Sequence, residues 1–217
     1  GPNMDDTASI PYKLANLEGG PTGRPAIVVG EKVCDLAECD RTIARSESSR
    51  DVRVPTTTRE IIEQYDTCRL RLGEIAAGLD GARFTPGLQG GDVRFCPPIL
   101  YPWNIVAVAV NYRAHGEEME RQMDEGYRKD PPYLFTKSPK ACLIGTGDTL
   151  IVPEGREKID WELELAAIIG KRATRVSVEE ALDYVWGYGL ILDMSDRAMR
   201  ERSNVFFNVD WFNAKSR

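Results

Sequence analysis

The sequence predicts an α+β protein made of a small N-terminal domain and a larger C-terminal unit with a mixed β-sheet. Short β-like segments near the N-terminus are separated by Gly-containing turns, and one long segment with helical periodicity follows them. Apolar strand-like runs then recur from residue 104 onward. With 217 residues, of which 42% are hydrophobic, the chain can bury a sizeable core. We place the two domains at residues 1–98 and 99–217.

The N-terminal domain is predicted to begin with a small β-meander. Turn residues at Gly19-Gly20-Pro21 and at Gly30-Glu31 separate three β-like segments. We therefore expect strands at residues 12–16, 26–29 and 32–36.

One amphipathic helix is expected over Thr56–Leu79. Its apolar residues recur close to a 3.6-residue period, after a Thr-rich start suited to N-capping. The next segment, Gly81–Pro98, is rich in Gly and Pro, which indicates a linker to the second unit. Gly1–Asn3, which precede Met4, are typical of the remnant of a cleaved expression tag, and we leave them out of the argument.

The C-terminal unit is predicted to be built around buried strands. The first, at residues 104–110, is an apolar run that follows Pro102. A long charged segment, Arg113–Lys129, comes next, and long connections of this kind are often functional. No closing apolar element precedes Arg217, so we expect this unit to be incomplete at its C-terminal end. Further strands are expected at residues 133–137, 161–170 and 187–193, and helices at residues 178–185 and 195–202.

Composition argues against nucleic acid or a membrane as a partner. The chain has 28 Lys and Arg against 34 Asp and Glu, a net charge of −6 that repels polyanions. Its longest apolar runs, Ile105–Val110 and Leu165–Gly170, are far shorter than the roughly 20 residues needed to span a bilayer. No signal segment opens the chain, so we expect a cytoplasmic protein. The single histidine, His115, excludes a His-rich zinc site within one chain.

Two glutamates form the first candidate site. Glu162 and Glu164 are two residues apart in a predicted strand, so their carboxylates leave the same face of it. Leu163 and Leu165 leave the other face. The pattern also fits the solvated outer face of an edge strand. Asp193 ends the next apolar strand, where it would otherwise cap the following turn.

If these two strands are neighbours, three carboxylates meet at one end of the sheet. They repel each other strongly unless a cation is present. Ligands that are all oxygen select hard ions such as Mg²⁺, Mn²⁺ or Ca²⁺ over zinc. Such an ion polarises carbonyl and enolate oxygens, which suits chemistry on 1,3-dicarbonyls or 2-oxo acids.

A second candidate is the pair His115 and Glu118. The two residues are three apart, so in a helix they share one face and the carboxylate can orient the imidazole ring. This is the arrangement of a general base that activates water. The alternative is a surface turn with an incidental histidine. The position of the pair, directly after a buried strand and at the start of the long charged segment, favours the functional interpretation.

Together the motifs resemble those of the fumarylacetoacetate hydrolase family. The resemblance covers Pro102 to Ser216, and the order of the motifs is more specific than any one of them. The motifs are Asn111-Tyr-x-x-His-x-x-Glu, Phe135-x-Lys137, Asp160-Trp-Glu-Leu-Glu-Leu, Ala181-Leu-Asp-Tyr-Val-x-Gly-Tyr and Asp193-x-Ser-x-Arg197.

The resemblance implies a mixed β-sandwich roll, usually a homodimer, that binds Mg²⁺ or Mn²⁺, with Ca²⁺ possible in a crystal. It implies that Glu162, Glu164 and Asp193 are the metal ligands, and that His115 with Glu118 is the water-activating pair. Three basic residues complete the implied site: Lys215 is assigned to catalysis, and Lys137 and Arg197 are assigned to substrate binding. Arg200 departs from the family pattern and is added as a further candidate for substrate binding.

The resulting functional hypothesis is a metal-dependent hydrolase that cleaves a C–C bond of an acylpyruvate-type substrate, a small oxo acid. One alternative is a 2-oxo acid decarboxylase or an enol/keto isomerase that uses the same metal site. A second alternative is a non-catalytic, ligand-binding member of the family. Arg200 stands where many members have Gln, and a further cation there would favour a substrate with a second carboxylate. The alternative is that Arg200 points to solvent.

Overall fold

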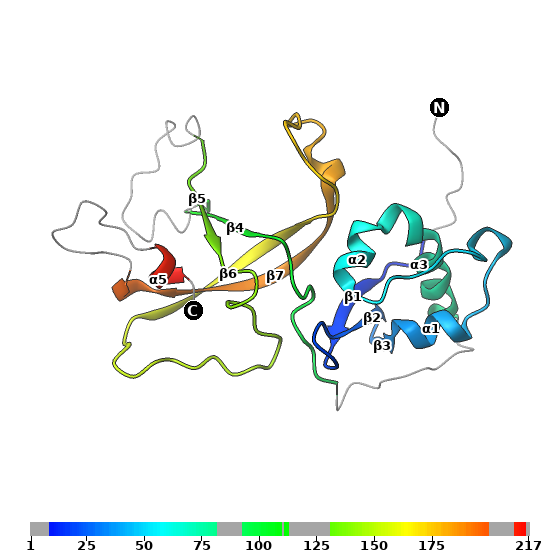
Figure 1. Cartoon of the computed structure of the whole chain (residues 1–217), viewed down its shortest axis with the longest axis horizontal. Coiled ribbons are helices and arrows are strands. Elements are labelled where there is room, and N and C mark those ends of the chain that lie inside the picture. Colours follow the sequence, from blue (N-terminus) through cyan, green and yellow to red (C-terminus); the bar gives the residue numbers. More distant parts are fainter. Residues whose placement is uncertain (1–8, 82–92, 110, 113–130, 200–210, 216–217) are drawn as a thin grey trace. The chain divides into compact units, whose positions relative to one another are not determined.

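The structure, a computed structural model, describes residues 9–81, 93–109, 111–112, 131–199 and 211–215 (Figure 1). Three of the predicted site residues, His115, Glu118 and Arg200, lie outside these residues. The chain divides into two compact units, and each is described by itself. The first contains Gly1–Tyr101, Ile144–Leu150 and Leu165–Ile191, and the second contains Pro102–Leu143, Ile151–Glu164 and Leu192–Arg217.

The predicted β-meander is confirmed in the first unit. Strands β1 (Lys13–Leu17), β2 (Arg24–Val29) and β3 (Lys32–Asp35) form an antiparallel sheet in the order β1-β2-β3. The two-residue turn between β2 and β3 begins at Gly30, whose φ of 58° lies in the left-handed region that favours glycine.

Among its described residues this unit has three α-helices, which differ from the single helix that was predicted. Helix α1 (Leu36–Thr42) was not expected; its N-cap Asp35 accepts a hydrogen bond from the backbone N–H of Glu38 at 3.1 Å. The segment predicted as one helix is two, α2 (Thr58–Glu63) and α3 (Tyr65–Asp80), because the backbone leaves the helical region at Gln64. A short 3₁₀ turn, η1, spans Glu47–Ser49.

The core of the first unit lies between the sheet and these helices. All five cysteines of the chain are free thiols, and three of them are buried here. The core residues are Ile27, Val29, Cys34, Leu36, Cys39, Ile61, Cys68, Leu72, Ile75, Ala76 and Leu79.

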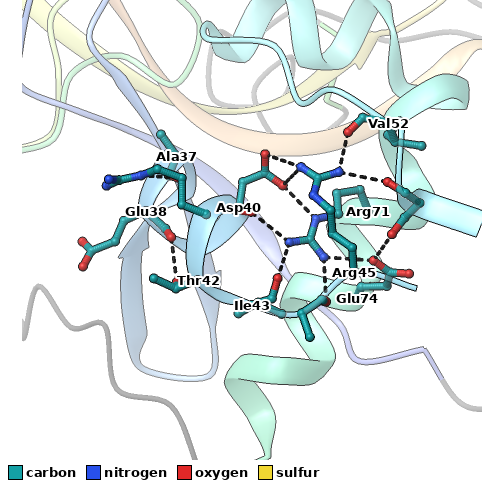
Figure 2. A network of polar contacts seen from close by, with 12 residues as sticks. Ala37, Glu38, Asp40, Thr42, Ile43, Arg45, Val52, Arg71 and Glu74 are labelled. Atoms are coloured by element: carbon teal, nitrogen blue, oxygen red, sulfur yellow. Dashed lines mark hydrogen bonds and ion pairs between the residues drawn. The ribbon is translucent and has the colours of Figure 1, made fainter. Parts of the chain in front are cut away.

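A buried arginine ties α1 to α3 (Figure 2). Arg71, on α3, has no solvent exposure, and its Nε donates to Asp40 Oδ1 at 2.7 Å. Nη1 donates to Glu74 Oε2 at 2.9 Å, and Asp40 Oδ1 also accepts a hydrogen bond from Arg45 Nη2. The remaining N–H groups of Arg71 are taken by backbone carbonyls, namely those of Asp40, Ile43 and Ala44. The buried charge is therefore fully hydrogen-bonded, as burial of a guanidinium requires.

The end of the predicted linker pairs with the edge of the first sheet. Phe95 forms a β-bridge with Leu17, and Cys96 N donates to Asn16 O at 2.9 Å. The last residues before Pro98 are therefore held by backbone hydrogen bonds to the N-terminal sheet.

Two further strand pairs follow. Strands β4 (Ile105–Val108) and β5 (Leu134–Lys137) are antiparallel, and Ile105 pairs with Lys137. Strands β6 (Ile159–Ile169) and β7 (Val185–Asp196) also pair. Backbone hydrogen bonds at both ends, Gly170 N to Tyr184 O at 2.9 Å and Arg197 N to Lys158 O at 2.8 Å, make this pair antiparallel.

Two predicted helices are corrected. Residues 178–185 contain only a 3₁₀ turn, η3 (Ala181–Tyr184), because Val185 already belongs to β7. The segment from Ser195 stays in β7 up to Asp196 and then forms the 3₁₀ turn η4 (Arg197–Met199), while residues 200–202 of the predicted helix lie outside the described residues.

Helix α5 (Trp211–Lys215) is the last described element. Helices and small antiparallel sheets together confirm the α+β class. Among the helices in the described part of the chain, none has the length and apolar character that crossing a bilayer requires.

Candidate functional site

The alternation of side chains along β6 places Glu162 and Glu164 on one face, as predicted. Both are half-buried, whereas Trp161, Leu163 and Leu165 are exposed, at 64%, 58% and 59%. The acidic face of the strand is therefore the covered one, and the apolar face is turned to solvent. This excludes the solvated outer face as the explanation for the two glutamates.

Strands β6 and β7 bring two of the three predicted ligands together around one ammonium group. Lys215, on α5, places its Nζ 2.5 Å from Glu162 Oε2 and 3.0 Å from Asp193 Oδ2. The same Nζ lies 5.2 Å from the centroid of the Phe135 ring. Lys215 is only 5% exposed, so these contacts form in an environment with little water.

A second lysine approaches Asp193 from β5. Lys137 Nζ lies 2.5 Å from Asp193 Oδ1 and 3.0 Å from the backbone carbonyl of Met194. Each carboxylate oxygen of Asp193 therefore contacts the ammonium group of a lysine. Lys137 is the last residue of β5, and Asp193 lies near the end of β7.

Arg197 lies directly after β7 and contacts two carboxylates of β6. Its Nη2 is 2.8 Å from Asp160 Oδ2 and 2.8 Å from Glu162 Oε1, and its Nε is 3.0 Å from the same Asp160 oxygen. Ser195 Oγ donates to Glu162 Oε2 at 3.0 Å. Glu162 is thus held by Arg197 on one oxygen and by Ser195 and Lys215 on the other.

These contacts keep Glu162 ionised. Burial by itself would raise the pKa of Glu162, but the hydrogen bond and charge of Lys215, the charge of Arg197 and the hydrogen bond from Ser195 together lower it. For Arg197, burial by itself would lower the pKa, but the hydrogen bond to Asp160 and the charges of Glu162 and Asp160 raise it. The contacts between Glu162 and Arg197 thus favour the charged form of both side chains.

Within the described residues, six side chains of this network pair their charges with one another. The repulsion between Glu162 and Asp193, which suggested a metal, is therefore offset by cationic side chains. The group holds three carboxylates and three cations, which are Asp160, Glu162, Asp193, Lys137, Arg197 and Lys215.

The donor chemistry still fits a hard divalent cation. Oxygens of Glu162 and Asp193 already enclose one cationic group, the Lys215 ammonium, and oxygen donors without thiolates suit Mg²⁺ or Mn²⁺. Glu164 points to the same face of β6 and has contacts of its own. Across the residues that the structure describes, however, there is no cluster of three or more acidic, thiol or imidazole side chains placed to hold a metal ion.

The structure thus unites five of the predicted site residues in one network in the second unit. These are Glu162, Asp193, Lys137, Arg197 and Lys215. Asp160 and Ser195 had no predicted role and also belong to it. Strand alternation could have found both, because Asp160 shares a face with Glu162, and Ser195 shares one with Asp193.

The comparison with known families identifies the class of the protein. Residues 104–217 match the family described as fumarylacetoacetate (FAA) hydrolase C-terminal. This match spans more than half of the chain and contains the whole carboxylate and lysine network. The chain belongs to the fumarylacetoacetate hydrolase family.

Relatives and solved structures agree with this assignment. An uncharacterised protein of Pyrococcus horikoshii is 42% identical over 99 residues, which are 46% of this chain and 40% of that protein. Maleylpyruvate hydrolase from Sphingobium sp. SYK-6, solved in complex with manganese(II) and pyruvate, is 28% identical with a TM-score of 0.57, over 85% of this chain and 59% of that one. Fumarylacetoacetate hydrolase from Exiguobacterium antarcticum is 25% identical with a TM-score of 0.59, over 95% and 62%. The chain spans less than two thirds of the length of each.

Proposed function

We propose that the protein is a divalent-metal-dependent hydrolase that cleaves a C–C bond of an acylpyruvate-type substrate. The observation that carries the proposal is the convergence of Glu162 and Asp193, from two adjacent strands, on one cationic group. Membership of the family supports it, and so does the likeness to a hydrolase that was solved with manganese(II) and pyruvate.

Glu162, Glu164 and Asp193 are the residues proposed to hold the metal, with Mg²⁺ or Mn²⁺ as the ion. When bound, such an ion supplies Lewis-acid polarisation of the 2-oxo group and stabilises negative charge on the enolate oxygen. The depressed pKa of Glu162 supports this role, because the residue offers a carboxylate and not a carboxylic acid at neutral pH.

The cationic side chains are proposed to bind the acidic end of the substrate. Lys137 and Lys215 each hold an ammonium within the carboxylate network, and Arg197 presents its guanidinium beside it. A substrate carboxylate entering this region would meet donors that are already ordered and poorly hydrated, which strengthens the interaction. Arg200 is proposed as a further cation for a second substrate carboxylate.

His115, oriented by Glu118, is proposed as the general base. It takes a proton from water as the water oxygen bonds to the distal carbonyl carbon of the substrate. The C–C bond then breaks, and its electron pair goes to the departing enolate, which is protonated to the 2-oxo acid. This part rests on the sequence motif and the family, since both residues lie outside the described ones.

The decisive experiment is a substrate screen. Purified protein is stripped with EDTA, reloaded with Mn²⁺ or Mg²⁺, and assayed against acylpyruvates, with oxaloacetate and a 2-hydroxymuconate-type compound as probes of other reactions. We expect metal-dependent cleavage of an acylpyruvate. Turnover of oxaloacetate alone would instead favour decarboxylation, and turnover unaffected by EDTA would overturn the metal dependence. Size-exclusion chromatography with light scattering tests the homodimer that the family implies.

A further inference from the structure

Asp160 opens the Asp160-Trp-Glu-Leu-Glu-Leu motif but has no role in the proposed reaction. It lies two residues before Glu162 on β6, so the two carboxylates share one face of the strand. Asp160 is about half exposed, at 47% of its side chain, whereas Glu162 is 16% exposed. Its carboxylate is therefore not forced into the network by burial.

Asp160 Oδ1 accepts a hydrogen bond from the backbone N–H of Trp161 at 2.9 Å, and the other oxygen of Asp160 contacts Arg197. Two N–H groups of one guanidinium edge, Nε and Nη2, donate to Asp160 Oδ2 at 3.0 and 2.8 Å. The same Nη2 also donates to Glu162 Oε1 at 2.8 Å. The backbone N–H of Arg197 is fixed as well, by the hydrogen bond to Lys158 O at 2.8 Å. The backbone of Arg197 is thus fixed by the hydrogen bond to Lys158, and its guanidinium is fixed by the hydrogen bonds to Asp160.

This geometry gives Arg197 a second role beside the proposed contact with substrate. Within the described residues its side-chain contacts use Nε and Nη2, the edge that faces β6, and none of them uses Nη1. A guanidinium committed to a carboxylate by charge-assisted hydrogen bonds has a fixed plane. Arg197 therefore fixes the position of Glu162 Oε1, and Asp160 fixes Arg197.

We propose that Asp160 is a positioning residue of the metal site, which clamps Arg197 so that Arg197 holds the Glu162 carboxylate in its ligating orientation. The inference rests on the proposed function in so far as Glu162 is a metal ligand. Groups that orient metal ligands typically change metal affinity 10- to 100-fold when they are removed.

The first arm of the test measures metal binding. Free Mn²⁺ is followed by electron paramagnetic resonance during titration of the wild type and of three variants, Asp160→Asn, Arg197→Gln and the double variant. We expect each single variant to weaken Mn²⁺ binding about tenfold. We expect the double variant to be no weaker than Arg197→Gln, because Asp160 acts through Arg197. Glu157→Gln, an exposed carboxylate in the same unit, is the matched control and should bind Mn²⁺ as the wild type does.

The second arm needs no metal. In ¹H–¹⁵N spectra of the metal-free protein, we expect a slowly exchanging Nε–H signal from Arg197, assigned by its loss in Arg197→Lys. The signal should be lost or broadened in Asp160→Asn and retained in Glu157→Gln. Circular dichroism on every variant separates this local change from unfolding.

The two arms distinguish the inference from the proposed function. A wild type that binds no Mn²⁺ would overturn the proposed function, while the Nε–H signal still decides whether Asp160 clamps Arg197. A signal that persists in folded Asp160→Asn, or additive losses in the double variant, would overturn the inference.

Discussion

Lys137 on β5 and Asp193 on β7 form a buried ion pair, with Nζ 2.5 Å from Oδ1 and both side chains less than a tenth exposed. The pair is one of the links between β5 and the end of β7. It also shows that Asp193, which was predicted as a metal ligand with turn capping as the alternative, belongs to a network of charges, where its second oxygen lies 3.0 Å from Lys215 Nζ.

Replacing Lys137 by Met should destabilise the protein. Removing one partner of a buried ion pair costs on the order of 3–5 kcal/mol. Because Lys215 still contacts Asp193, we expect a loss nearer about 2–3 kcal/mol. Urea unfolding measures it, with Lys158→Met, an exposed lysine of the same unit, as the control. Equal stability of the two variants would contradict the buried pair.

Glu74 should make stability depend on pH. Burial alone would raise the pKa of this carboxyl, but hydrogen bonds from Ser46, Ser49 and Arg71 lower it to about 2. In the unfolded chain a Glu carboxyl has a pKa of about 4.3, so the stabilisation by Glu74 is complete above about pH 5 and is lost as the pH falls toward 2. Glu74→Gln should therefore be less stable at pH 7 and show a shallower loss between pH 5 and pH 3. Urea unfolding across this range measures both, and parallel curves for variant and wild type would refute the assignment.

Glu164 is the predicted ligand whose place in the site most needs a direct test. If it holds the metal with Glu162 and Asp193, Glu164→Gln should weaken Mn²⁺ binding at least tenfold, because a charged oxygen ligand is replaced by a neutral one. Folding should be little changed, since Glu164 lies on a half-buried strand face. Isothermal titration with Mn²⁺ on the EDTA-treated protein measures the affinity, with Glu157→Gln as the control. Full Mn²⁺ affinity in Glu164→Gln would remove it from the ligand set.

His115→Ala should abolish water-dependent cleavage. Loss of a general base typically costs on the order of 10²–10⁴ in rate. Mn²⁺ affinity should stay the same, because the imidazole is not among the proposed ligands. Single-turnover cleavage of the acylpyruvate identified in the screen measures the rate, and Mn²⁺ titration measures the affinity. If decarboxylation survived in this variant while hydrolysis vanished, the site would be assigned to both reactions.

The elements that could be predicted are those with a recognisable local sequence pattern. The β-meander was predicted from its turn residues, and the strand containing Glu162 from its apolar and acidic alternation. Helix α1 was missed although Asp35 and Glu38 have the spacing of an N-terminal capping box, because the segment is too short for helical periodicity to be visible. The break at Gln64 was missed because no Gly or Pro marks it.

The site was predictable in its residues but not in its contacts. Period-two alternation placed Glu162 and Glu164 on one face, yet it could not tell which face of β6 would be covered. The network of Lys137, Lys215 and Asp193 joins residues from β5, α5 and β7, and no local pattern encodes such long-range pairing. For the same reason the sequence suggested a metal as the answer to charge repulsion before the chain's own lysines were seen to provide one.

The inverted alternation of β6 has a consequence for how the chain behaves in concentrated solution. Within the second unit, Trp161 and Leu163 form an outward stripe on β6, and Leu192 of β7 is exposed as well. At low ionic strength the net charge of −6 keeps molecules apart, but this repulsion reaches only about 8 Å at physiological salt. Two forces therefore set the colloidal stability of the chain: a short-ranged apolar attraction at this stripe, which salt strengthens, and a charge repulsion, which salt screens. Purification should accordingly use low salt and dilute samples.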